Sequence, residues 1–98
     1  MTTRADRIAA VLRHGFDPTI LRIVDDSARH AGHAGAAPGG ETHYSLLLVA
    51  EAFRGRNRVD RSRAVHAALA AEFAGGLHAL ALTLRTPEEQ KRVAATAH

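Results

Sequence analysis

The hydrophobic pattern changes from helical to strand-like near Pro18. Residues 2–16 carry an apolar stripe at three- and four-residue spacing, which predicts an amphipathic helix. That stripe consists of Ile8, Val11 and Leu12. Thr3 is suited to be the N-cap of this helix, and Gly15 predicts its end. Residues 19–27 are rich in β-branched residues and show no helical stripe, so we predict a strand there.

Two further strands are predicted in the middle and towards the end of the chain. Residues 42–53 contain a continuous apolar run, which is typical of a strand covered on both faces. Residues 77–85 alternate instead, and their inward face would carry Leu80, Leu82 and Leu84. Residues 28–41 are rich in glycine and alanine and predict a loop of unusual length between the first two strands. We expect these two strands to form an antiparallel hairpin.

Two more helices complete the pattern. Residues 59–74 predict a helix whose apolar stripe consists of Val65, Ala68, Leu69 and Phe73. Residues 86–97 predict another, with Thr86 as N-cap, Pro87 at the first helical position and Glu89 completing a capping box with Thr86. The order α-β-β-α-β-α predicts an α/β (α+β) fold over residues 1–98, taken as a single domain. A strand–helix–strand crossover after a hairpin implies a three-stranded mixed sheet, with the helices packed on one face.

Charge and composition narrow the possible classes of protein. The 98-residue chain has a net charge of +3 and no cysteine, so it can supply neither disulfides nor thiolate metal ligands. The first twenty residues lack the apolar core of a signal peptide, and no apolar run is long enough to cross a membrane. We therefore expect a cytoplasmic protein without a membrane partner. No P-loop, dinucleotide fingerprint or nucleophile–base set is present, which argues against an enzyme.

Three histidines lie in or beside the predicted glycine-rich loop: His30, His33 and His43. Their imidazoles could be solvated loop groups, contacts to nucleic acid, or metal ligands. A zinc site is conceivable, because catalytic zinc is bound by three protein ligands and a water. However, the spacing of His30 and His33 falls in a loop rather than on a helix face, and no carboxylate is placed as a base. His43 alternates within the second predicted strand, which favours a structural role.

The chain resembles BolA-like proteins over nearly its whole length. The matching segments stand in order: DDSARHAGH at 25–33, GGETHY at 39–44, F-R-G at 53–55, RVDRSRAVHAALAAE at 58–72 and LHALAL at 77–82. The resemblance implies a fold of the class II KH-like type. It also implies an accessory protein that pairs with a monothiol glutaredoxin and shares a bridging 2Fe–2S cluster in iron–sulfur trafficking or iron homeostasis. Some members of the family are described as DNA-binding transcriptional regulators.

The resemblance also implies ligand positions. The histidine of the family's HAL motif corresponds to His78. The loop ligand corresponds to His30, with His33 as the nearest substitute because the loop is extended. The absence of cysteine places the chain in the histidine-loop subtype. The glutaredoxin and a glutathione would then supply the thiolates, and the isolated chain is expected to lack the cluster and to be a monomer or a weak homodimer.

The most basic stretch runs from Arg54 to Arg63 and contains five arginines and one aspartate. Its cations are Arg54, Arg56, Arg58, Arg61 and Arg63. They could neutralise DNA phosphates, which would give salt-dependent binding, or they could dock an acidic surface of the glutaredoxin. The family usually has Arg-His-Arg where this chain has Arg61-Ser62-Arg63, so a role that needs the central imidazole is lost here while the charge is kept.

Overall fold

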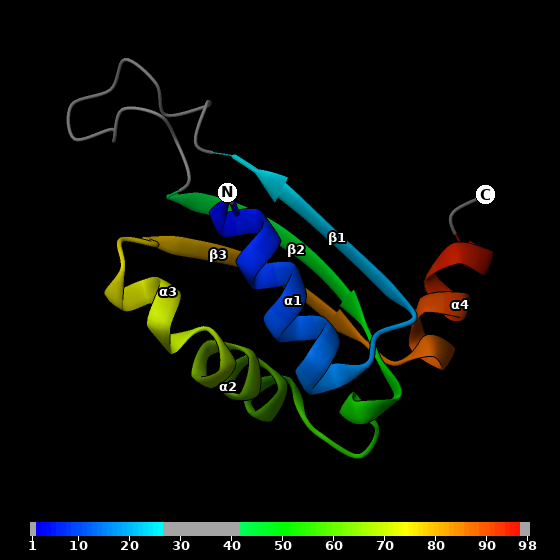
Figure 1. Cartoon of the computed structure of the whole chain (residues 1–98). Helices are drawn as coiled ribbons and strands as arrows, with labels where there is room; N and C mark the ends of the chain where they lie inside the picture. The colour runs from blue at the N-terminus through cyan, green and yellow to red at the C-terminus, as the bar shows by residue number, and fades with distance from the viewer. Residues whose placement is uncertain (1, 27–41, 97–98) are drawn as a thin grey trace.

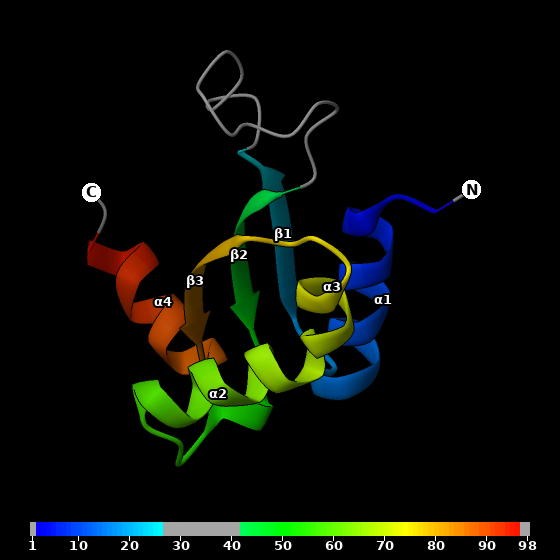
Figure 2. The same ribbon diagram turned by 90° about the vertical axis from the view of Figure 1, so that its left-hand side faces the viewer.

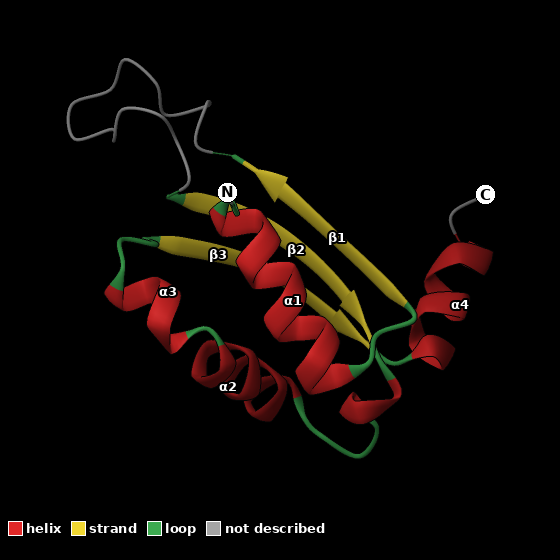
Figure 3. Cartoon of the chain, viewed as in Figure 1, coloured by secondary structure: helices red, strands yellow, loops and turns green. Residues whose placement is uncertain are grey.

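The computed structural model describes residues 2–26 and 42–96. Three strands form one layer, and the helices lie around it (Figure 3). In chain order the elements are α1 (Arg4–Phe16), β1 (Ile20–Asp25), β2 (His43–Val49), the 3₁₀ turn η2 (Glu51–Phe53), α2 (Arg58–Ala68), α3 (Ala70–Ala74), β3 (Ala79–Arg85) and α4 (Pro87–Thr96).

The sheet has the order β1-β2-β3, with β2 in the centre (Figure 1). Strands β1 and β2 are antiparallel, and Ile23 lies opposite Leu46. Strands β2 and β3 are parallel, and Leu46 lies opposite Leu82. This arrangement confirms the mixed three-stranded sheet and the α+β class predicted from the sequence.

The helices divide between the two sides of the sheet. Figures 1 and 2 together show α1, α2 and α3 on one face, while α4 lies on the other side near the end of β3. The prediction that the helices pack on one face is therefore correct for α1, α2 and α3, whereas α4 lies on the other side. Val49 points away from them, because side chains alternate along a strand and Leu48 points towards them. It is nevertheless only 1% exposed and lies outside the main core cluster, which agrees with the position of α4.

Reciprocal caps fix the beginning of two helices. In α1, the Thr3 hydroxyl accepts a hydrogen bond from the Asp6 N–H at 3.1 Å, and the Asp6 carboxylate accepts one from the Thr3 N–H at 3.0 Å. In α4, Thr86 and Glu89 form the same pair of bonds at 3.2 and 2.8 Å. Such boxes satisfy N–H groups that the helix leaves without partners. Both predicted caps are confirmed.

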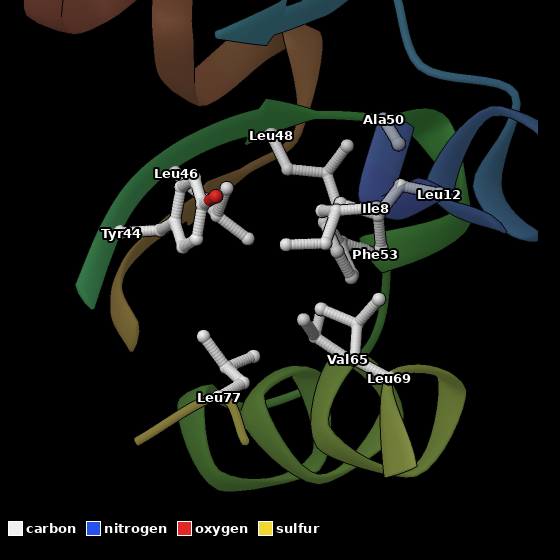
Figure 4. Packing of buried hydrophobic residues seen from close by; sticks show 10 residues of the cluster. All are labelled: Ile8, Leu12, Tyr44, Leu46, Leu48, Ala50, Phe53, Val65, Leu69 and Leu77. Atoms are coloured by element: carbon white, nitrogen blue, oxygen red, sulfur yellow. The ribbon is translucent and has the colours of Figure 1, made fainter. Parts of the chain in front are cut away.

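The core lies between β2 and the layer formed by α1 and α2 (Figure 4). Its buried residues are Ile8, Leu12, Tyr44, Leu46, Leu48, Ala50, Phe53, Val65, Leu69 and Leu77. The three leucines predicted on one face of β3 pack against this cluster, as expected. Two predicted stripe positions are wrong. Val11 is 37% exposed, and Ala68 is exposed, because each lies to the side of the face that meets the sheet.

The structure corrects three predicted boundaries. The second strand ends at Val49 rather than 53, and the chain then forms the turn η2. The helix predicted over 59–74 is divided at Leu69, whose φ of −101° and ψ of 15° depart from helical geometry. Helix α1 continues beyond Gly15 and is capped by Asp17, which adopts the left-handed conformation. Aspartate tolerates this conformation, so the glycine was not the signal for the end.

Candidate histidine pair and basic groove

Two imidazoles lie side by side where β2 and β3 begin. The rings of His43 and His78 have their centroids 5.9 Å apart and meet edge to face at 77°. The sheet register produces this contact, because His43 lies opposite Ala79, the residue after His78. The N–H of His78 also donates to the carbonyl of Thr42 at 2.9 Å. The pairing of parallel strands therefore brings together two histidines that are far apart in the sequence.

The two rings differ in their surroundings. His43 is half-buried, and its Nδ1 lies 2.8 Å from the Thr42 hydroxyl, which orients the ring. His78 is exposed.

The other candidate ligands, His30 and His33, lie outside the described residues, in 27–41. The described residue that precedes this segment lies beside the histidine pair, since the N–H of Asp26 donates to the carbonyl of His43 at 2.8 Å. The pairing of His78 with either residue stays a prediction, and the alternative zinc site of His30, His33 and His43 is untested. Within the described ranges, no cluster of three or more metal-ligating side chains occurs.

Arg54, the first cation of the basic stretch, is held by two carboxylates. Its guanidinium lies 2.6 Å from Glu51 and 3.2 Å from Glu88. Hydrogen bonds from Arg54 are the main reason that the pKa of each carboxyl group lies below its ordinary value. All three side chains are largely exposed, so solvent screens the electrostatic attraction between them. Much of the charge of Arg54 is therefore balanced within the chain.

Arg61 is held more firmly and is largely buried. Its side chain is 12% exposed and makes an ion pair of 2.6 Å with Glu89 in α4. The same guanidinium donates to the backbone carbonyls of Arg56 at 2.9 Å and Leu84 at 3.3 Å. It also lies over the ring of Phe53, 5.8 Å from the centroid. These contacts join α2 to β3 and α4, which explains why an arginine stands in the first turn of a helix despite the unfavourable dipole.

The remaining cations of the stretch are Arg56, Arg58 and Arg63, and all three are exposed. In the described parts of the chain, no carboxylate lies within ion-pair distance of them. Arg56 and Arg58 line a groove of about 800 Å³ between the start of α2 and the end of β3, which we call the basic groove. Its lining consists of Arg56, Asn57, Arg58, Arg61, Ser62, Leu82, Thr83, Leu84, Arg85 and Glu89.

The Arg61–Glu89 pair predicts a pH dependence of stability. The hydrogen bond from Arg61, followed by that from the Thr86 N–H, lowers the pKa of Glu89 from 4.5 to about 2. Because the folded-state pKa is depressed, the ionised carboxylate stabilises the fold above about pH 5, and this contribution disappears as the pH falls towards 2. We expect Glu89→Gln to cost about 1 kcal/mol at pH 7, since the partly exposed carboxylate is screened, and much less near pH 2.

Urea unfolding between pH 7 and pH 2 measures this effect. Glu88→Gln is the matched control, because Glu88 lies beside Glu89 but makes only exposed ion pairs. We expect this control to change stability less than Glu89→Gln does at pH 7. A constant difference between Glu89→Gln and the unsubstituted protein over the whole range would contradict the prediction.

Known proteins match most of this chain in sequence. The family model for BolA-like protein matches residues 12–89. Bos taurus BolA-like protein 1 is 39% identical over 84 residues, which cover 86% of this chain and 59% of that protein. Arabidopsis thaliana SufE-like protein 1, chloroplastic/mitochondrial, is 41% identical over 91 residues, covering 89% of this chain and 24% of that protein. This chain therefore spans less than two thirds of the length of these relatives.

A solved structure agrees with the fold. BolA1 from Arabidopsis thaliana superposes with a TM-score of 0.81 at 40% identity, over 91% of this chain and 97% of that one. In the described residues, no helix has the length and apolar character needed to cross a membrane. A cytoplasmic location stays a prediction, because the description of one relative places that protein in organelles.

Proposed function

Since the chain belongs to the BolA-like protein family, we propose that it is an accessory protein that pairs with a monothiol glutaredoxin and holds a bridging 2Fe–2S cluster. Its role would be in iron–sulfur cluster trafficking or iron homeostasis. The observation that carries the proposal is the contact between His43 and His78, which the parallel pairing of β2 and β3 brings together.

The chemistry of the ligand set supports shared ligation. A 2Fe–2S cluster needs four protein or thiol ligands, and this chain has no cysteine, so it can contribute imidazoles only. The glutaredoxin and a glutathione would supply the thiolates. The exposed ring of His78 is accessible to a cluster presented by a partner, and Thr42 keeps the ring of His43 in one orientation beside it. When bound, the cluster would supply redox-active iron and transferable sulfide.

Co-reconstitution with a monothiol glutaredoxin and glutathione tests the proposal. We expect the mixture to give a heterodimer with visible absorption and circular dichroism bands different from those of the glutaredoxin alone. His78→Ala should abolish these differences, because it removes the exposed imidazole. His14→Ala is the matched control, since His14 is an exposed histidine on α1, and it should leave the spectrum unchanged. If His78→Ala retained the heterodimer spectrum, the ligand assignment would be wrong.

The same assay identifies the second imidazole. His30→Ala, His33→Ala and His43→Ala should be compared, because the resemblance implies His30 or His33 whereas the described geometry brings His43 beside His78. Only the variant that removes the second ligand should alter the spectrum as strongly as His78→Ala.

A second candidate function is a DNA-binding regulator that uses the Arg54–Arg63 region. The exposed cations of the basic groove favour it. It is weakened by the ion pairs of Arg54 and Arg61 with carboxylates of the same chain, and no aromatic ring on which bases could stack lines the basic groove. Pairing with a glutaredoxin is therefore the better-supported function.

A further inference from the structure

We propose that the basic groove docks an extended acidic peptide of a partner protein, which adds a strand to the outer edge of β3. This would be a second docking site, because the basic groove lies at the Arg85 end of β3 and the histidine pair lies before its Ala79 end. At about 3.3 Å per residue the two ends of the strand are about 20 Å apart. The proposal does not depend on the cluster.

The edge of β3 is open to such an addition. The sheet ends with β3 on one side, so only one edge of this strand pairs with β2. The N–H of Ala79 donates to Thr42, and the carbonyl of Arg85 accepts from Ala50, so the odd-numbered residues bond towards β2. The main-chain groups of Leu82 and Leu84 therefore point outwards, since successive residues of a strand alternate in this respect.

The residues that line the basic groove agree with the outward orientation of these main-chain groups. Four successive residues of β3 line it, from Leu82 to Arg85, as expected when the strand edge itself forms the wall. Arg61 donates to the outward carbonyl of Leu84. Across the described residues, the outward N–H groups of Leu82 and Leu84 and the carbonyl of Leu82 have no hydrogen-bond partner. They form the alternating set of donors and acceptors that an added strand uses.

Charge selects an acidic occupant. Four arginines and one glutamate line the basic groove, and the glutamate is already bound by Arg61. Arg85 donates to the neutral side chain of Gln90, so its charge remains unbalanced, as do those of Arg56 and Arg58. The N-terminus of the eleven-residue helix α2 adds to the positive field. A second copy of this chain would bring like charges together, which disfavours self-pairing through this edge.

The edge groups also favour a peptide over a nucleic acid. A phosphate backbone offers acceptors only, whereas the free groups of Leu82 include an acceptor as well as a donor. Because no aromatic side chain lines the basic groove, single-stranded bases would lack the stacking surface that usually supports them.

Nuclear magnetic resonance titration with a seven-residue capped peptide of alternating glutamate and valine tests the proposal. At saturation we expect hydrogen exchange of the Leu82 and Leu84 amides to slow by about tenfold, because both would become bonded to the added strand. The same peptide with lysine in place of glutamate should bind at least about tenfold more weakly. N-methylation of the peptide at the residues facing β3 should remove the protection.

Two variants connect the binding to the basic groove. Arg58→Glu should weaken binding of the acidic peptide by about tenfold, since it reverses a charge on the lining of the basic groove. Arg63→Glu is the matched control, because Arg63 is an exposed arginine of α2 outside the lining, and it should change the affinity by less than about twofold. The cluster is tested separately through His78→Ala, a residue outside the basic groove, so failure of peptide binding is distinguishable from failure of the proposed function.

Four results would overturn the proposal. Peptide binding without protection of Leu82 and Leu84 would show that the β3 edge is not used. Equal affinity of the peptide for Arg58→Glu and the unsubstituted protein would show that the basic groove is not used. Binding of an eight-nucleotide oligothymidylate in the basic groove with no binding of the peptide would show a nucleic-acid site instead. Protection of the same amides that depends on the concentration of the protein alone would show that the occupant is a second copy.

Discussion

Replacing Phe53 with alanine is expected to lower the free energy of unfolding by about 3–5 kcal/mol, the usual cost of deleting a fully buried aromatic side chain. Phe53 is 0% exposed. Its ring lies 5.3 Å from that of Phe16 in α1 and under the guanidinium of Arg61 in α2. The cavity left by alanine would therefore separate three elements at once. Urea unfolding followed by circular dichroism measures the change.

Two further variants keep this prediction testable if Phe53→Ala does not fold. Phe53→Leu retains much of the buried volume and should be destabilised less than the alanine variant. Ala52→Ser changes the exposed neighbour in the same turn and should alter stability by less than about 0.5 kcal/mol. A loss of under about 1 kcal/mol for Phe53→Ala would mean that the turn η2 does not anchor the core.

The regular part of the fold could be predicted because each element carries its own local signal. Alternating leucines indicate β3, and the boxes of Thr3 and Thr86 mark the starts of α1 and α4. The turn η2 was missed because the apolar run through Ala50 to Phe53 looks the same whether the chain is extended or turning. Burial of Phe53 in the core decides between the two conformations, and a one-dimensional pattern does not contain that information.

The contact between His43 and His78 could not be predicted from the sequence. His78 could be selected by resemblance, but its neighbour depends on the register of two strands that are distant in the sequence. Alternation along β2 suggested only that His43 belongs to a strand. Which residue lies opposite it follows from the pairing with Ala79, and a shift of one residue would separate the two rings.

In the basic stretch, the sequence does not reveal that Arg61 pairs with a carboxylate that also caps α4. The sequence predicts that Glu89 caps α4, and this role alone accounts for a glutamate at that position. The same carboxylate binds Arg61, which is 28 residues earlier in the chain. A count of charges along the sequence therefore treats five arginines as equivalent, although the fold makes Arg61 a part of its own framework.

Arg61→Ala is therefore expected to lower the free energy of unfolding by about 2–3 kcal/mol at pH 7. Removal of the guanidinium leaves the carbonyls of Arg56 and Leu84 without this donor and Glu89 without its buried cation. The partial exposure of Glu89 keeps the loss below that of a fully buried pair. Arg63→Ala, two residues along the same helix, is the matched control and should stay within about 0.5 kcal/mol.

The pH dependence of this loss separates the ion pair from simple packing. As the pH falls from about 5 towards 2, Glu89 becomes protonated even in the folded protein, so the difference between Arg61→Ala and the unsubstituted protein should shrink. Arg61→Lys should recover only part of the stability, because an ammonium cannot reach two carbonyls and a carboxylate in the geometry of a guanidinium. Equal stabilities for Arg61→Ala and Arg63→Ala at pH 7 would show instead that Arg61 is free to bind an external ligand, as the sequence alone suggested.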